Sequence, residues 1–128
     1  MAPEDCAHVL VVDDDLAIRN VLTDLLMEQG YKVSVAVHGQ QALEICAATP
    51  VPDLILLDLQ MPVMDGVEFS RLKDRDPALS RIPVCVMAAV TAATRVPRSA
   101  SVVLRKPLGS SDLLSVVKRF CGPRPKAS

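Results

Sequence analysis

The chain has 128 residues, of which 50% are hydrophobic and 23% charged, and a formal net charge of −1. This length predicts a single domain with its own hydrophobic core, and the apolar content excludes an intrinsically disordered chain. The near-neutral charge argues against a general nucleic-acid-binding surface. With one Tyr, two Phe and no Trp, the chain also lacks the aromatic side chains of a stacking platform for single-stranded nucleic acid.

Short apolar runs alternate with helical patterns along the chain. Apolar residues at helical spacing, followed by Gly30, predict a helix over residues 16–29. Further helices are predicted over residues 40–48, 66–74 and 111–121, and strands over residues 9–12, 32–37, 54–57, 84–87 and 102–104. This alternation predicts an α/β sandwich in which helices cover both faces of a parallel sheet.

The cysteines and the N-terminal residues indicate the cellular compartment. The four cysteines are far apart and form no metal-binding pattern: Cys6, Cys46, Cys85 and Cys121. Three of them lie in apolar stretches. The opening residues MAPEDCAH have no basic or apolar segment of a secretory signal, and no apolar run reaches the about 20 residues of a membrane span. We therefore expect reduced thiols in a cytoplasmic protein that does not contact a membrane.

Polar residues at the ends of the predicted strands are the candidates for a functional site, because parallel sheets bind ligands outside the carboxyl ends of their strands. Asp13 and Asp14 follow the first strand, Asp58 follows the third, and Lys106 follows the last. If the first and third strands are neighbours, the three carboxylates converge, and they repel one another unless a cation neutralises them. Mg²⁺ fits this set better than Ca²⁺, since the EF-hand pattern is absent. Lys106 would pair with Asp58 at rest and with an anionic group when one is bound.

Each of these residues also has an ordinary structural interpretation. We assign Asp15 to the cap of the following helix, where its carboxylate accepts main-chain hydrogen bonds. Asp58 alone would pass for a loop residue and Lys106 for a surface cation. Their coincidence with Asp13 and Asp14 at three strand ends favours a functional site.

Three segments resemble the receiver domains of bacterial two-component response regulators: LVVDDDLAIRNVL (10–22), PDLILLDLQMPVMDG (52–66) and RKP (105–107). The resemblance spans residues 8–121 and implies a flavodoxin-like (βα)5 fold with strand order 2-1-3-4-5. We expect residues 9–121 to form this domain, with residues 1–8 as an N-terminal extension and residues 122–128 as a flexible tail.

The resemblance also implies a function for each matching residue. Asp58 would accept a phosphoryl group, and the Mg²⁺ ligands would be Asp13, Asp14, Asp58 and the backbone carbonyl of Gln60. Lys106 and the backbone of Ala89 would contact the phosphoryl group, with a cis peptide between Lys106 and Pro107. The chain would be a signalling phosphoacceptor, an enzyme at most toward its own phosphorylation and dephosphorylation. Its partners would be a sensor histidine kinase or phosphotransfer protein and a downstream protein target, with no direct binding to DNA.

Two positions depart from the family pattern. Receivers normally carry Ser or Thr at the end of the fourth strand and an aromatic residue in the fifth, where this chain has Ala88 and Val103. Pro97 also predicts that the helix expected between the fourth and fifth strands is short or irregular. These departures predict that phosphorylation proceeds but that its coupling to conformation is altered.

The main alternative is a pseudo-receiver, an interaction scaffold that acts independently of phosphorylation. Ala88 and Val103 favour it, while Asp58 and Lys106 count against it. An aspartate-nucleophile phosphatase is disfavoured because Gln60 stands where its second aspartate is needed. A flavin or nucleotide binder is disfavoured because no glycine-rich loop follows the first strand.

Overall fold

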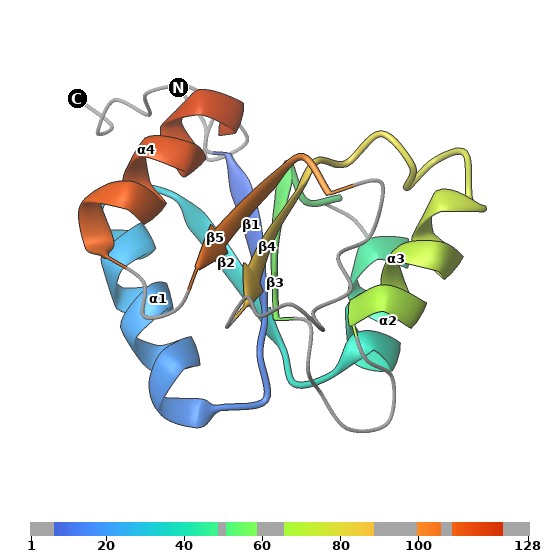
Figure 1. The fold of residues 1–128 in the computed structure, drawn as a ribbon, viewed down its shortest axis with the longest axis horizontal. Coiled ribbons are helices and arrows are strands. Elements are labelled where there is room, and N and C mark those ends of the chain that lie inside the picture. Colours follow the sequence, from blue (N-terminus) through green and yellow to red (C-terminus); the bar gives the residue numbers. More distant parts are fainter. Residues whose placement is uncertain (1–6, 49–50, 59–65, 89–99, 106–108, 122–128) are drawn as a thin grey trace.

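The computed structural model describes residues 7–48, 51–58, 66–88, 100–105 and 109–121 (Figure 1). A five-stranded sheet has the order β2-β1-β3-β4-β5, and all four strand pairings are parallel. The strands are β1 (His8–Val12), β2 (Lys32–Ala36), β3 (Leu54–Asp58), β4 (Val84–Ala88) and β5 (Val102–Arg105). The helices of the described residues are α1 (Leu16–Glu28), α2 (Gly39–Ala47), α3 (Gly66–Asp74) and α4 (Ser110–Cys121). The predicted fold class and strand order are confirmed.

Helices α1 and α4 cover one face of the sheet, and α2 and α3 cover the other (Figure 1). Successive side chains of a strand point to opposite faces, so each central strand contributes to both cores. Val11 packs in the core under α1 and α4, with Leu26 and Val117, whereas Leu10 packs in the core under α2 and α3, with Phe69. Every residue of β1, β3 and β4 is therefore buried, as their continuous apolar runs predict.

The edge strand β2 is less buried than the central strands. Lys32 and Val35 are exposed, and only Ala36 is fully buried. The alternation of apolar residues that predicts this strand is therefore not matched by alternating burial. Its position at the sheet edge explains this, because only β1 flanks it.

Helix α1 ends as its sequence predicts. Gly30 has a φ of 91°, a conformation that favours glycine, and its amide donates to the carbonyl of Met27 over 3.0 Å. The amide of Tyr31 donates back to Leu26 over 3.1 Å, so the chain turns directly into β2. The short turn brings the start of β2 beside β1, where Lys32 aligns with His8.

The ends of two central strands lie where the candidate site is expected. Asp58 is the last residue of β3 rather than the first residue after it, so the expected strand boundary was one residue too early. Ala88 is likewise the last residue of β4. The helix expected between β4 and β5 falls on residues 89–99, outside the described residues.

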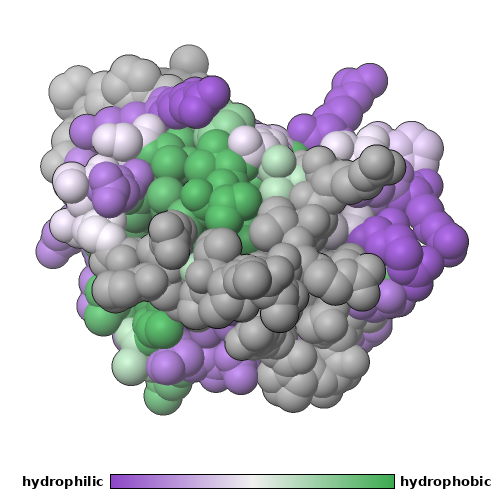
Figure 2. Space-filling model, viewed as in Figure 1, coloured by the Kyte–Doolittle hydropathy of each residue, from purple (hydrophilic) through white to green (hydrophobic). Residues whose placement is uncertain are grey.

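The described surface is uneven in polarity. Apolar residues gather between α4 and β5, whereas the surface over α3 is hydrophilic (Figure 2). Val102 and Leu104 of β5 pack against the core under α1 and α4, so Val103, which is 38% exposed, points to the opposite face of the sheet. Among the described residues, no helix combines the length and apolar character needed to cross a membrane.

Candidate metal and phosphoacceptor site

Asp13 extends the sheet one residue beyond β1. Its amide donates to the carbonyl of Ala36 over 3.1 Å, continuing the pairing of β1 with β2. The side chain is fully buried, and its Oδ1 accepts a hydrogen bond from the amide of Asp15 over 2.9 Å. One hydrogen bond therefore holds the main chain of Asp13, and the other holds its carboxylate.

Asp15 is the N-cap of α1, as the sequence predicts. Its backbone is extended, and its carboxylate accepts from the amides of Ala17 and Ile18 over 2.9 and 3.2 Å. These bonds satisfy main-chain donors at the start of a helix, which have no partner within the helix. Asp15 therefore stabilises α1, and the candidate metal ligands of this acidic segment are Asp13 and Asp14.

Asp58 lies next to Asp13 because β1 and β3 are paired. Val12 aligns with Leu57, so the residues that follow them, Asp13 and Asp58, come side by side at the carboxyl edge of the sheet. Asp58 is 5% exposed, and Met87 of β4 aligns with it on the other side. The site is therefore built on the central strands.

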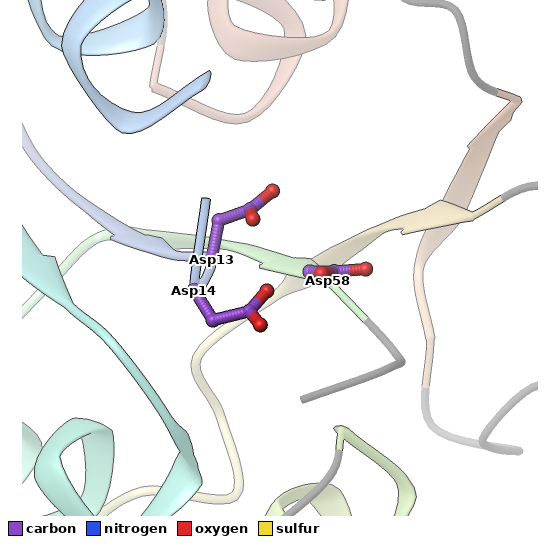
Figure 3. Close-up of side chains that lie close together, drawn as sticks. All are labelled: Asp13, Asp14 and Asp58. Atoms are coloured by element: carbon purple, nitrogen blue, oxygen red, sulfur yellow. The ribbon is translucent and has the colours of Figure 1, made fainter. Parts of the chain in front are cut away.

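Three carboxylates meet at this edge. One oxygen from each of Asp13, Asp14 and Asp58 lies within 4.8 Å of the others (Figure 3). Asp13 and Asp58 are buried, whereas Asp14 is exposed and opens the cluster to solvent. The convergence predicted for these residues is confirmed.

The donor set fits a hard divalent cation. Carboxylate oxygens are the ligands that Mg²⁺ takes, and Mg²⁺ commonly combines a few of them with water. Two buried carboxylates of the same sign are also costly without a neutralising cation nearby. Asp13, Asp14 and Asp58 could hold Mg²⁺, with the exposed side of Asp14 left for water or a phosphoryl oxygen.

Arg19 is a residue of this site that the sequence analysis did not identify. Its Nη1 donates to the main-chain carbonyl of Asp13 over 2.9 Å. A signal was present, because Arg19 is the fourth residue of a helix whose first turn has no acidic residue. A cation near the positive end of a helix is unfavourable unless it has a specific partner.

The two positions that depart from the family pattern lie on β4 and β5. Ala88 aligns with Arg105 at the end of β4 and packs in the core under α2 and α3, with 5% of its surface exposed. Its methyl group cannot form a hydrogen bond. Val103 aligns with Val86 and is exposed. The other expected site residues, Gln60, Ala89, Lys106 and Pro107, lie outside the described residues, and their functions stay predictions.

Comparison with known proteins agrees with this geometry. The family described as the response regulator receiver domain matches residues 9–118. The two-component response regulator ORR5 of Oryza sativa subsp. japonica is 33% identical over 118 residues, covering 89% of this chain and 85% of the relative. The residues matched by the family, 9–118, include the three clustered carboxylates, the strands β2 to β5 and all of β1 except His8.

Solved structures show the same fold. The chemotaxis protein CheY4 of Vibrio cholerae superposes with a TM-score of 0.79 at 29% identity, covering 90% of this chain and 98% of that one. The receiver domain of the sensor histidine kinase PA1611 from Pseudomonas aeruginosa, described with a magnesium ion coordinated in its active site cleft, gives a TM-score of 0.84. At 24% identity, over 91% of this chain and 98% of that one, this second structure supports the fold alone. The chain belongs to the response regulator receiver domain family.

Proposed function

We propose that this receiver accepts a phosphoryl group on Asp58 in a Mg²⁺-dependent reaction. One observation carries the proposal: the Asp58 carboxylate ends a central strand and lies within 4.8 Å of the carboxylate oxygens of Asp13 and Asp14. The three carboxylates are oxygen ligands of the kind that Mg²⁺ takes, which supports this choice of metal.

The proposed reaction is a transfer from a phosphorylated histidine of a kinase or phosphotransfer protein. A carboxylate oxygen of Asp58 bonds to phosphorus as the bond from phosphorus to the histidine nitrogen breaks, and the imidazole leaves with the electron pair. Bound Mg²⁺ would neutralise negative charge on the transferring group. Asp13 and Asp14 hold their oxygens toward Asp58, and Lys106 is the proposed contact of the phosphoryl group.

The output is proposed to be a contact with a downstream protein rather than with DNA. The apolar surface between α4 and β5 supports a contact of this kind (Figure 2). We also propose a cytoplasmic location, because the thiols of Cys46 and Cys85 are free and buried, as in proteins of reducing compartments.

Ala88 supports altered coupling between phosphorylation and conformation. A hydroxyl at this position would bond the phosphoryl group only in the phosphorylated state, and the methyl group of Ala88 removes that bond. The loss amounts to about 1–3 kcal/mol, or a ten- to hundredfold change in the population of the responding conformation. The same observation favours the second candidate function, a pseudo-receiver that binds its partner whether or not it is phosphorylated.

Intact mass measurement tests the phosphoacceptor. With acetyl phosphate and Mg²⁺, the wild-type chain should gain the mass of one phosphoryl group, and Asp58→Asn should gain none. Asp24→Asn, which changes an exposed carboxylate on α1, should be labelled like wild type. Labelling that persists in Asp58→Asn would place the acceptor elsewhere, and an unlabelled wild type would favour the pseudo-receiver.

A titration with beryllofluoride and Mg²⁺, followed by NMR, tests the coupling. Altered coupling predicts shifts near Asp58 that leave α4 and β5 largely unchanged. Shifts that spread through both elements would show that the receiver responds fully despite Ala88.

A further inference from the structure

Arg19 occupies an unfavourable position for a cation. It is the fourth residue of α1, close to the end of the helix where the unpaired main-chain amides concentrate positive charge. An arginine without a specific partner would extend into solvent there. Arg19 is only partly exposed, and its side chain reaches back past the N-cap to Asp13.

Two hydrogen bonds join Arg19 to both ends of the acidic segment. Its side-chain Nη1 donates to the carbonyl of Asp13 over 2.9 Å, and its amide donates to the carbonyl of Asp15 over 3.0 Å. Asp14 lies between these two anchor points. The bond from the amide is the first hydrogen bond of the helix and does not depend on the side chain, so the bond to the carbonyl of Asp13 is the contribution of the guanidinium.

Two further hydrogen bonds among the described residues fix Asp13. The amide of Asp13 is held by Ala36, and its Oδ1 is held by the amide of Asp15. Neither of these bonds involves the carbonyl of Asp13, which is part of the peptide group that joins Asp13 to Asp14. Arg19 supplies that third point of attachment.

We propose that Arg19 is a positioning residue for the metal site, holding Asp13 and Asp14 in their binding arrangement before the ion arrives. The proposal rests on the proposed function, since it assumes that the carboxylates take up Mg²⁺. Three like charges within 4.8 Å push one another apart, and the bond from Arg19 opposes this displacement. A site that is already ordered does not lose binding energy to ordering its ligands.

The positive charge of Arg19 acts in the opposite direction, which makes the proposal testable. Charge alone predicts that removing the guanidinium strengthens Mg²⁺ binding, because a cation near the site repels the ion. Positioning predicts that the same change weakens binding by about three- to tenfold, the equivalent of one hydrogen bond. The two explanations thus differ in sign for Arg19→Gln.

The experiment is a Mg²⁺ titration of the full chain by NMR, with Arg19→Gln, Arg19→Lys and a control. Arg71→Gln is the matched control, because Arg71 is an exposed arginine that pairs with Glu68 on α3. We expect weaker binding in Arg19→Gln, a smaller loss in Arg19→Lys and wild-type affinity in Arg71→Gln. Phosphorylation of the Arg19 variants should recover at saturating Mg²⁺, since Asp58 is intact.

A measurement without metal separates positioning from a general loss of stability. Hydrogen exchange of the Asp15 amide should be faster in Arg19→Gln than in wild type, while amides of β3 keep their protection. If Arg19→Gln fails to fold, Arg19→Lys gives the same comparison with a smaller expected effect. Unchanged or tighter Mg²⁺ binding in the folded variants would overturn the proposal while leaving the proposed function intact. A wild-type chain that binds no Mg²⁺ would overturn both.

Discussion

All strands of the sheet run in the same direction, so the sheet has an amino edge, where the strands begin, and a carboxyl edge, where they end. The buried polar groups at these two edges differ in charge. At the amino edge, the His8 ring is hydrogen-bonded to the Ser34 hydroxyl over 2.7 Å, and the His8 amide donates to Asp53 over 2.8 Å. At the carboxyl edge, the groups that meet are carboxylates of one sign. The amino edge pairs donors with acceptors, so it holds the strands together. Among the described residues, the carboxyl edge brings together three carboxylates, which repel one another unless a cation neutralises them.

The comparison shows that burial alone does not identify a functional site. His8 and Asp58 are almost equally buried, at 4% and 5% exposure, at the ends of neighbouring strands. Among the described residues, His8 is hydrogen-bonded to a hydroxyl, whereas Asp58 lies beside two other carboxylates. Changes at the two edges should therefore have different signatures, one in metal binding and the other in stability.

The largest effect is expected at the carboxyl edge. Asp14→Asn removes one full charge from the cluster, so Mg²⁺ affinity should fall by about ten- to a hundredfold. The free energy of unfolding without Mg²⁺ should not fall, because repulsion among the carboxylates is relieved. Calorimetric titration and urea unfolding measure the two quantities, with Asp24→Asn as control. Wild-type affinity in Asp14→Asn would remove Asp14 from the ligand set.

At the amino edge the expected effect is on stability alone. Ser34→Ala removes the hydroxyl bonded to the His8 ring, and the free energy of unfolding should fall by about 1–2 kcal/mol. Mg²⁺ affinity should stay at the wild-type value. Urea unfolding checks this, and Ser115→Ala, at an exposed position on α4, is the control. A change in Mg²⁺ affinity in Ser34→Ala would mean that the two edges are coupled.

Lys73 extends the comparison to a buried positive charge. It is 1% exposed on α3, where its Nζ lies 3.4 Å from the carbonyl of Ser80 and 3.6 Å from the carboxylate of Asp74. Burial lowers the pKa of Lys73 below its ordinary 10.5, and Asp74 opposes this only in part. Lys73→Met, which keeps the volume and removes the charge, should raise the free energy of unfolding at neutral pH by about 1 kcal/mol.

The pH dependence of Lys73 has a definite sign. Below pH 10.5 the unfolded chain binds more protons at this lysine than the folded chain, so its contribution to stability rises with pH toward that value. Urea unfolding from pH 7 upward should therefore bring wild type closer to Lys73→Met. A constant difference between the two proteins would show that Lys73 titrates as in the unfolded chain.

The smallest effect is expected at the thiols, where burial disfavours ionisation and outweighs the attraction of the Lys73 ammonium for the Cys46 thiolate. Burial raises the pKa of Cys46 to about 11 and that of Cys85 to about 12. Both should react slowly with maleimide near pH 8, and the partly exposed Cys121 should react faster. Peptide mapping after timed labelling checks this order. Rapid labelling of Cys85 in the native protein would indicate that β4 opens locally.

Much of the fold and part of the site follow from sequence patterns. Continuous apolar runs predict the buried central strands, and acidic residues at the ends of two of them predict the carboxylate cluster. The hydrogen bond from Arg19 to Asp13 was not predictable, because it depends on how the chain turns from β1 into α1. The burial of Lys73 was not predictable either, since a lysine near the end of a helix ordinarily points to solvent.

The start of α2 shows a second limit of sequence patterns. His38 is the N-cap, and its Nδ1 accepts from the amide of Gln41 over 3.2 Å, while the Gln41 side chain accepts from the amide of Val37 over 2.8 Å. This arrangement resembles a capping box, but histidine takes the place of the usual serine or threonine, and Gln41 bonds the amide of the residue before the cap rather than that of the cap. The pattern of residue types alone did not reveal it.

The parallel pairing of every strand has a consequence for how the chain folds. No neighbouring strands can form a hairpin, so each pairing must wait for a crossover segment to close. The His8–Asp53 bond that ties β1 to the approach to β3 joins residues 45 positions apart. The carboxylates of Asp13 and Asp58 therefore meet only when the centre of the sheet forms. A cation that binds them favours the folded chain over the unfolded one, and on the proposed function Mg²⁺ should slow unfolding more than it speeds folding.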